Sequence, residues 1–298
     1  MRRSARRATG RAVPMRRQCG TMQVHFRLLE MDPGFRARQT ALEQATARRM
    51  AAAAAKWKVV TIPTVVHVVY HTDAENISDA QVKSQIKVLN RDFRKKNPDR
   101  TKVPSVWSGL VADVGVKFKL AKITRTQTNR TAFGDDDSVK SSATGGVDPW
   151  PTDKHLNVWV CTLAGGLLGY AQFPGGPAAT DGVVILNTAF GTTGTATAPF
   201  HLGRTTTHEV GHWVNLRHIW GDTEDCSGSD FVADTPNAAG PNFGKPTFPH
   251  ITCGNGPNGD MFMNYMDYVD DDAMLMFTTG QAERMHAALG GPRKPSLK

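Results

Sequence analysis

At 298 residues, the chain is long enough to bury a full hydrophobic core, and it has room for one large domain or two smaller ones. Its hydrophobic content of 40% is typical of a globular protein, and no window approaches the roughly 18 apolar residues of a membrane-spanning helix. The net charge is +9, but the seven arginines among residues 1–20 account for all but +2 of it. A near-neutral body, with no aromatic residues interleaved among the basic ones, argues against a nucleic-acid-binding protein.

The N-terminal arm is basic but lacks the apolar segment of a secretory signal peptide. We interpret it as an unfolded leader, and contact with a nucleic acid or an acidic surface is the alternative. Residues Met31–Ala55 follow as an Ala- and Arg-rich stretch that predicts a helix with few large apolar side chains. We expect the main folded part to start near Trp57.

The segments after Trp57 alternate between strand and helix patterns. Ile62–Tyr70 is apolar and β-branched, which predicts a strand. A capping box at Ser78–Gln81, followed by apolar residues at helical spacing, predicts a helix. Further strands are predicted at Val116–Leu120, Leu156–Thr162 and Gly182–Leu186, with a sheet edge at Leu167–Phe173, a long loop at 126–148 and a last helix from Thr278, capped with Gln281, to Gly290.

The run His208–His218, HEVGHWVNLRH, carries the strongest chemical signal. His208 and His212 are four residues apart, so they share one face of a helix and can hold one metal ion. His218 would point away from them on an uninterrupted helix, so the helix has to end before it. Asn215 stands where that break is needed, because Asn tolerates the left-handed conformation that ends many helices. We predict a zinc helix over about 202–216.

Three neutral imidazoles that leave a fourth position open are typical of catalytic rather than structural zinc. Zinc held in this way lowers the pKa of water and polarises a carbonyl group. Glu209, next to His208, is placed to take the proton from the attacking water and pass it to the leaving amine. The residues therefore indicate hydrolysis of an amide, above all a peptide bond, and a chance pair of helical histidines is the alternative.

The same run resembles the metzincin zinc-protease signature HExxHxxGxxH, with Asn215 where the family usually has Gly. A second segment, Met263–Tyr268 (MNYMDY), resembles the metzincin Met-turn, a tight turn beneath the metal. Within the metzincins, the chain is most similar to the pappalysin family, and the similarity runs from about Ile62 to Leu289. The segments that carry it are LLGYAQFPGG, DGVVI, HEVGHWVNLRHIWGD, DFVADTP, NYMDY and MFTTGQAERM.

The resemblance implies an α/β fold with a metzincin-like catalytic domain at residues 57–298. In this fold an upper twisted mixed sheet with helices faces an irregular lower subdomain across an active-site cleft. The sheet edge would receive the substrate backbone by strand addition. Met266 would be the methionine of the Met-turn, and Tyr268 a tyrosine that approaches the zinc and stabilises the oxyanion.

Pappalysins tend to cleave before Arg or Lys by means of an acidic residue a few positions after the Met-turn tyrosine. Asp272 matches this position, where a carboxylate would form two hydrogen bonds with a guanidinium group. A solvated turn of three aspartates, Asp270–Asp272, is the alternative. The family resemblance also implies a disulfide between Cys226 and Cys253, and with it an oxidising compartment.

The segment RRQCGT, residues 16–21, resembles the pro-forms of the family, in which a cysteine thiolate takes the open zinc position. Cys19 is thus a candidate switch that keeps a zymogen latent, and an incidental thiol is the alternative. Residues 1–56 would then be a basic leader and an inhibitory pro-segment. An enzyme that cuts before Arg could remove them near Arg48, Arg49 or residues 51–55.

The loop Asp222–Pro236 is dense in oxygen donors, and pappalysin relatives bind calcium here. Asp230 and Thr235 match family ligand positions, so the resemblance implies structural calcium beside the catalytic zinc ion. A solvated acidic loop without a cation is the alternative.

Together these features predict a secreted zinc endopeptidase that acts on protein or peptide substrates and is made as a zymogen. The alternative from another class is a catalytically silent binding protein that keeps the metzincin fold. The intact Glu209, the three histidines and Tyr268 argue against that alternative. We expect neither a membrane span nor a nucleic-acid partner.

Overall fold

The computed structural model describes residues 16–52, 57–291 and 293. Residues 1–15 of the predicted basic leader, and residues 53–55 of the predicted maturation region, lie outside this part of the chain. None of the helices in the described ranges is long and apolar enough to cross a membrane. The predicted domain boundary near Trp57 stays a prediction.

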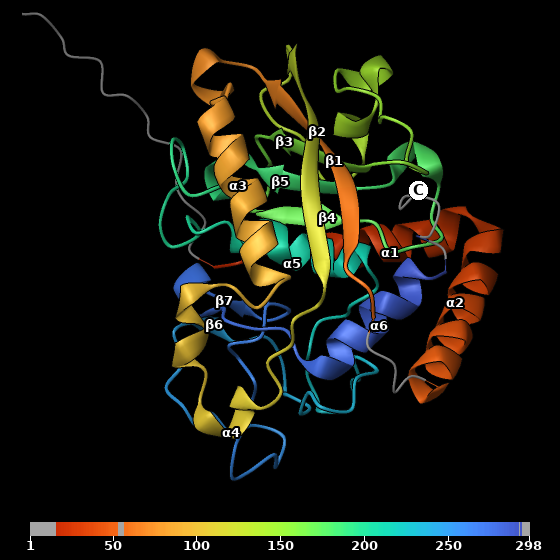
Figure 1. The fold of residues 1–298 in the computed structure, drawn as a ribbon. Coiled ribbons are helices and arrows are strands. Elements are labelled where there is room, and N and C mark those ends of the chain that lie inside the picture. Colours follow the sequence, from red (N-terminus) through yellow and green to blue (C-terminus); the bar gives the residue numbers. More distant parts are fainter. Residues whose placement is uncertain (1–15, 53–56, 292, 294–298) are drawn as a thin grey trace, which may run out of the picture.

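A five-stranded sheet forms the upper half of the molecule, in the order β2-β1-β3-β5-β4 (Figure 1). Neighbouring strands are parallel, except that β4 runs antiparallel to β5 at the edge. Parallel strands that are covered on both faces need apolar side chains throughout, which explains the continuous apolar runs in the sequence. The strands are β1 (Val60–Tyr70), β2 (Val116–Gln127), β3 (Leu156–Cys161), β4 (Gly169–Ala171) and β5 (Val183–Leu186).

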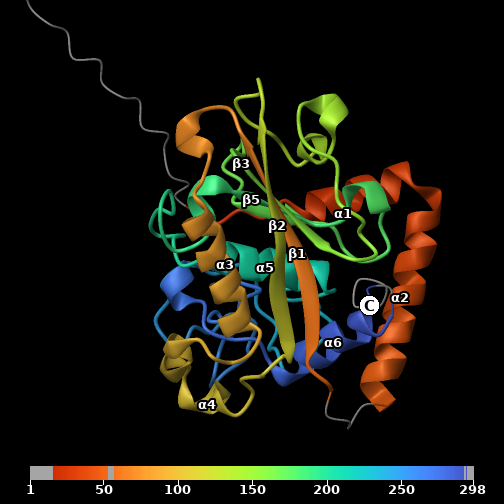
Figure 2. The ribbon, with the colours of Figure 1, turned by 45° about the horizontal axis from the view of Figure 1, so that its top comes forward.

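Helix α3 (Asp79–Asp92) packs on β2, and α5 (Arg204–Trp213) lies beneath the edge formed by β4 and β5 (Figure 2). Ser78 caps α3 as predicted, since its side chain accepts a hydrogen bond from the backbone N–H of Gln81. The reciprocal half of the predicted capping box is not formed. The Gln81 side chain donates instead to the carbonyl groups of Asn187 and Phe190, because it is buried against that loop.

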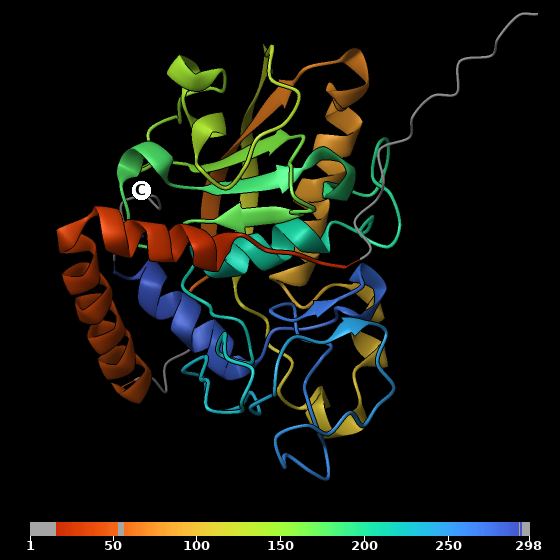
Figure 3. The same cartoon turned by 180° about the vertical axis from the view of Figure 1, so that it is seen from behind.

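Two N-terminal helices, α1 (Thr21–Met31) and α2 (Pro33–Ala52), lie along one side of the molecule (Figure 3). Side chains of both helices, among them Val24, Leu28 and Phe35, are buried in a core cluster with Trp159 and Tyr170 of the sheet. Helix α2 confirms most of the predicted helix 31–55, but it starts at Pro33 because Asp32 ends α1 in an extended conformation.

The lower half is mostly irregular, as the resemblance implied. Its last helix, α6 (Thr279–Leu289), begins with the predicted capping box, in which Thr278 and Gln281 satisfy each other's backbone N–H groups. The remaining short elements are α4 (Ser105–Ser108), β6 (Phe243–Gly244), β7 (Tyr268–Val269) and the 3-10 turns Asp73–Glu75, Pro98–Lys102, Ser138–Lys140, Ser142–Thr144, Ala178–Thr180, Asn187–Ala189 and Asp271–Ala273.

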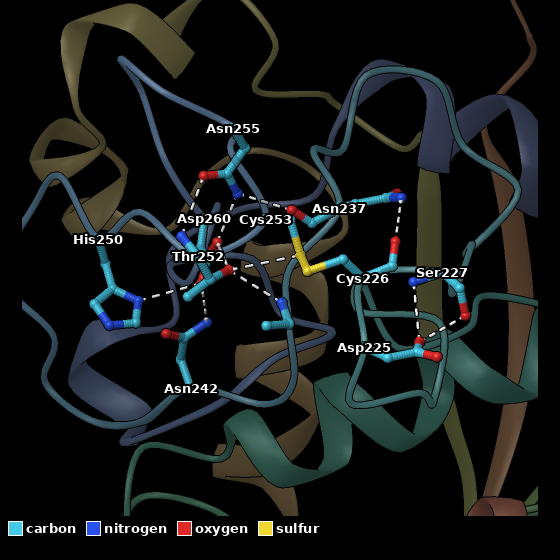
Figure 4. Close-up of a disulfide and its surroundings, with 11 residues drawn as sticks. Asp225, Cys226, Ser227, Asn237, Asn242, His250, Thr252, Cys253, Asn255 and Asp260 are labelled. Atoms are coloured by element: carbon cyan, nitrogen blue, oxygen red, sulfur yellow. Dashed lines mark hydrogen bonds and ion pairs between the residues drawn. A yellow bond between two sulfur atoms is a disulfide. The ribbon is translucent and has the colours of Figure 1, made fainter.

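A disulfide joins Cys226 to Cys253 within this irregular half, which confirms the predicted pairing (Figure 4). Closing a loop of this size stabilises the folded chain by roughly 3 kcal/mol, mainly by restricting the unfolded state. Beside the bond, the buried carboxylate of Asp260 accepts hydrogen bonds from Thr252, Asn255 and Asn242. The disulfide and this carboxylate give fixed shape to a loop that has few strands to order it.

Candidate metal centre

The zinc helix ends where the sequence requires it. Helix α5 runs from Arg204 to Trp213, which is shorter at both ends than the predicted 202–216. Asn215 then takes the left-handed conformation with φ 79, as its side chain predicted. This turn brings His218 back to the same point as the two histidines of the helix.

The three imidazoles converge through their Nε2 atoms. His212 Nε2 lies 3.1 Å from the Nε2 atoms of both His208 and His218. Ligand nitrogens of a tetrahedral zinc ion, each about 2.0–2.1 Å from the metal, stand about 3.3 Å apart, so the spacing fits zinc. All three rings are buried, and burial holds the pKa of His208 and of His212 well below the ordinary value. Those two rings are therefore neutral, as metal binding requires.

Each ring is oriented by an acceptor on its other nitrogen. The Nδ1 atoms of His208 and His212 lie 2.8 Å from the carbonyl oxygens of Tyr265 and Leu216. His218 Nδ1 lies 2.5 Å from the carboxylate of Asp222. Because an acceptor faces every Nδ1, the proton sits there, and three Nε2 lone pairs point at one another. A metal cation bound between the three rings would make that arrangement favourable.

Asp222 is a functional residue that the sequence analysis missed, since it was interpreted only as the start of an acidic loop. Its position four residues after His218 was the available signal, because metal-binding histidines usually donate to a carboxylate or a carbonyl oxygen.

Cys19 completes the cluster. Its Sγ and the ligand nitrogens of the three histidines all lie within 4.8 Å of one another, and all four side chains are buried. Burial, and after it the charge of Glu209, raises the pKa of the Cys19 thiol well above its ordinary value. A divalent cation at the histidines acts in the opposite direction, because a coordinating thiol is deprotonated. The predicted fourth ligand is thus within reach of the site.

Residues around Cys19 extend the sheet. The backbone N–H of Gly20 donates to the carbonyl oxygen of Gly169, and that of Leu168 donates to Gln18. Cys19 and Gly169 form a parallel bridge, and the backbone N–H of Ala171 donates to the Thr21 hydroxyl. The N-terminal segment therefore occupies the edge of β4, where a substrate backbone was expected.

Glu209 lies beside the metal cluster with no access to solvent. Its carboxylate accepts hydrogen bonds from the Thr21 hydroxyl at 3.0 Å and from the Cys19 thiol at 3.4 Å. Burial raises the pKa of Glu209 to about 7, although both hydrogen bonds act to lower it. A pKa near neutrality suits a group that must both accept and return a proton. Gly169 allows the edge strand to come this close, since a Cβ there would lie 2.9 Å from Glu209 Cγ.

The predicted Met-turn lies directly beneath the zinc helix. Met266 is fully buried, and a Cβ on Gly211 would lie only 2.5 Å from its sulfur atom. The glycine in the middle of the histidine motif is therefore required by packing, which the sequence analysis did not anticipate. Asn264 holds the turn by accepting a hydrogen bond from the backbone N–H of Met266 at 2.9 Å.

Tyr268 lies beside the metal cluster, in contact with two of the histidine rings. Its ring centroid lies 4.9 Å from that of His218 and 5.7 Å from that of His208. Burial, and then the charges of Cys19 and Glu209, raise the pKa of Tyr268 well above its ordinary value. The phenol therefore keeps its proton and can donate a hydrogen bond to an oxygen that becomes negative.

Two neighbouring aspartates, Asp271 and the predicted specificity residue Asp272, lie in different surroundings. Asp272 is partly exposed and pairs with Lys245 at 2.5 Å. Asp271 is fully buried, and its Oδ1 accepts from Arg17 Nη2 at 2.6 Å. Asp271, rather than the predicted Asp272, binds the arginine of the N-terminal segment, and the role of Asp272 in specificity stays a prediction.

The Arg17 guanidinium makes three further contacts beside Asp271. It donates to the Thr205 hydroxyl at 2.9 Å and to the Val269 carbonyl oxygen at 3.2 Å, and it lies over the Phe200 ring at 5.0 Å. The second carboxylate oxygen of Asp271 accepts from the backbone N–H of Leu202 at 2.7 Å. The groups around Asp271 thus bind a planar cation.

The predicted calcium residues lie apart from this cluster. Asp230 and Thr235 are buried and hydrogen bonded to each other at 2.7 Å. Within the described ranges, the only group of three or more His, Cys, Asp and Glu side chains that could hold a metal ion is that of Cys19 and the three histidines. The arrangement does not bring Asp230 together with the metal centre.

Comparisons with known proteins identify metalloproteases as relatives of this chain. The family model described as "Pregnancy-associated plasma protein-A" matches residues 140–290. An extracellular metalloprotease of Arthroderma benhamiae is 33% identical over 232 residues, which are 76% of each chain. An extracellular metalloprotease of Pyricularia oryzae is 34% identical over 82% of this chain and 80% of that protein.

Two solved structures from Tannerella forsythia are closer in sequence. Mature mirolysin in complex with a cleaved peptide is 48% identical, with a TM-score of 0.80 over 81% of this chain and 97% of that one. A promirolysin mutant is 44% identical, with a TM-score of 0.87 over 94% of this chain and 97% of that one. The match to the pro-form thus extends over more of the chain than the match to the mature form.

Proposed function

The chain belongs to the pregnancy-associated plasma protein-A (pappalysin) family and is a metalloendopeptidase, and we propose that it uses zinc, cleaves before Arg or Lys and is made latent by Cys19. The observation that carries the proposal is the convergence of three oriented Nε2 atoms beside a buried carboxylate. The relatives are named extracellular metalloproteases, and a disulfide is typical of an oxidising compartment. We therefore propose that this chain is secreted.

In this proposal the protein residues divide the work of hydrolysis. His208, His212 and His218 hold zinc, which when bound makes water more acidic and polarises the substrate carbonyl group. Glu209 takes a proton from the attacking water and returns it to the leaving amine nitrogen, a role supported by the position of its carboxylate beside Cys19 and the three histidines. Tyr268 donates a hydrogen bond to the oxygen that gains negative charge.

We propose that the pocket at Asp271 receives the side chain that follows the cleaved bond. Arg17 supports this assignment, because a guanidinium group already forms charged hydrogen bonds there. From Arg17 the N-terminal segment runs over the metal cluster to Thr21, so it passes from the pocket to the far side of the cleft. A substrate with its Arg in the same pocket runs the opposite way, and the pro-segment is therefore a poor substrate for the site that it blocks.

Asp271→Asn is expected to lower kcat/KM for peptides with Arg after the cut by roughly 100-fold in the activated enzyme, since a charged hydrogen bond contributes about 1.5–3 kcal/mol. Asn keeps an acceptor for the backbone N–H groups that Asp271 holds, so the fold should persist. Asp272→Asn is the matched control and should change kcat/KM little, because that side chain pairs with Lys245 and not with Arg17. The opposite result, with Arg preference lost only in Asp272→Asn, would contradict the assignment.

We also propose a structural calcium ion at Asp230 and Thr235. Burial raises the pKa of Asp230 to about 7, against the hydrogen bond from Thr235, and a nearby cation would stabilise the charged carboxylate. Removing calcium with EGTA is then expected to lower the melting temperature by roughly 5–10 °C, with recovery on adding calcium but not magnesium. An unchanged melting temperature in differential scanning calorimetry would remove this proposal.

A further inference from the structure

Two arginines, Arg217 and Arg284, lie on the far side of the cleft from Asp271, and a carboxylate of the pro-segment, Glu43, is hydrogen bonded to Arg284 and interacts with Arg217 through its charge. Arg284 of α6 is 1% exposed, and its Nη2 donates to Glu43 of α2 at 2.6 Å. Its Nε donates to the carbonyl oxygen of Asn215, the residue that ends the zinc helix, at 2.7 Å. Arg284 is therefore fixed in place by the catalytic part of the chain, independently of Glu43.

Arg217 lies beside Arg284 and directly precedes the metal ligand His218. Its Nε is buried and has no hydrogen-bond partner among the described residues. Both guanidinium groups lie over the ring of Phe231, Arg217 at 5.3 Å and Arg284 at 5.5 Å. Burial lowers the pKa of Arg217; the negative charge of Glu43 acts to raise this pKa, and the positive charge of Arg284 acts to lower it. The nearby Asp222 is already bonded to His218.

The position of this pair in the cleft follows from the path of the pro-segment. Residues 18–21 run parallel to β4, meeting Leu168, Gly169 and Ala171 in turn. Phe173 follows two residues after Ala171. The centre of its ring lies 5.7 Å from the Arg217 guanidinium and 5.5 Å from the centre of the His212 ring, which it meets edge-on. Arg17 and Asp271 lie at the other end of the same segment. The arginines therefore face the half of the cleft that holds the residues before the cut.

From this geometry we propose that Arg217 and Arg284 form a subsite for an acidic side chain on the N-terminal side of the cleaved bond. The inference rests on the proposed function, because it takes the pocket at Asp271 as the site of the residue after the cut. In the zymogen, Glu43 stands in for the substrate carboxylate. Once the pro-segment leaves, two closely spaced guanidinium groups remain, held by Asn215 and Phe231, and a planar carboxylate is the ligand that they fit.

The test uses enzyme activated from the full-length precursor and quenched fluorescent peptides with Arg after the cut. Glu and Gln are exchanged one position at a time before the cut, and kcat/KM is measured at low and high ionic strength. We expect Glu to be preferred over Gln roughly tenfold at one position, and less at high ionic strength. Arg217→Gln should abolish this preference while the Gln peptide is still cleaved, and Arg284→Lys should reduce it.

Arg125→Gln is the matched control, because Arg125 pairs with Asp79 far from the cleft, and it should keep the full preference. Arg217→Gln is the decisive variant if changing Arg284 disturbs the turn at Asn215. Equal rates for Glu and Gln peptides at every position, or a preference that survives both substitutions, would overturn the subsite alone. Failure to cleave any Arg peptide would instead overturn the proposed function, and the subsite with it.

Discussion

Glu209→Gln is expected to lower kcat/KM by a factor on the order of 10³ or more, the upper range for losing a general acid–base group. Gln has nearly the same shape as Glu but cannot take a proton from water at neutral pH. The three histidines and their acceptors, Tyr265, Leu216 and Asp222, are untouched by this change. Metal content and melting temperature should therefore remain those of the unaltered protein.

The measurement is hydrolysis of a fluorescent Arg peptide, with metal content determined on the same samples. Glu283→Gln on α6 is the matched control, since its side chain is partly exposed and away from the histidines. A Glu209→Gln enzyme that retains zinc and most of its activity would exclude Glu209 as the proton carrier. Zinc-loaded protein that hydrolyses no peptide even with Glu209 intact would favour the silent binding protein over the protease.

Cys19→Ser in the full-length precursor is expected to raise the activity of the uncleaved protein about 10- to 100-fold. This is the size of effect that removing a residue in contact with a metal site typically has. A serine hydroxyl binds zinc poorly at neutral pH, so the thiolate that blocks the site is lost. Latency should not vanish entirely, because Arg17 still pairs with Asp271 and Gly20 still bonds to Gly169. Adding Arg17→Gln should therefore release further activity.

This second prediction is measured as peptide hydrolysis at early times, with gel analysis to show that the precursor is still intact. Cys161→Ala is the control, because this other free cysteine is buried in the sheet and is not part of the metal cluster. Intact Cys19→Ser precursor that stays as inactive as the unaltered precursor would show that the switch is not the basis of latency.

The sequence predicted those parts of the molecule that depend on local chemistry. The capping box of Thr278 and Gln281, the left-handed Asn215 and the edge strand around Tyr170 all follow from short-range preferences, and all are present. The metal cluster followed as well, since the spacing of His208 and His212 fixes their relation on the helix and the turn at Asn215 brings His218 to them. The Cys226–Cys253 bond required the family resemblance, because spacing alone does not pair cysteines.

What the sequence did not predict depends on contacts between distant segments. Asp272 and Asp271 are equivalent in a run of three aspartates, and only burial against Leu202 and Arg17 distinguishes them. The Gln81 side chain does not bond to the backbone of Ser78 as the capping box predicted, because it bonds to a loop more than 100 residues away in the sequence. The cluster of Glu43, Arg284 and Arg217 was not predicted either, since these residues come from α2, from α6 and from the turn after the zinc helix.

Zinc binding at the three histidines is tested by the metal content of the purified full-length protein, measured by inductively coupled plasma mass spectrometry. We expect one zinc ion per chain, its loss in His212→Ala, and activity of the activated enzyme that a chelator removes and added zinc restores. Correctly folded protein that holds no transition metal, and that cannot be loaded with zinc, would contradict this expectation.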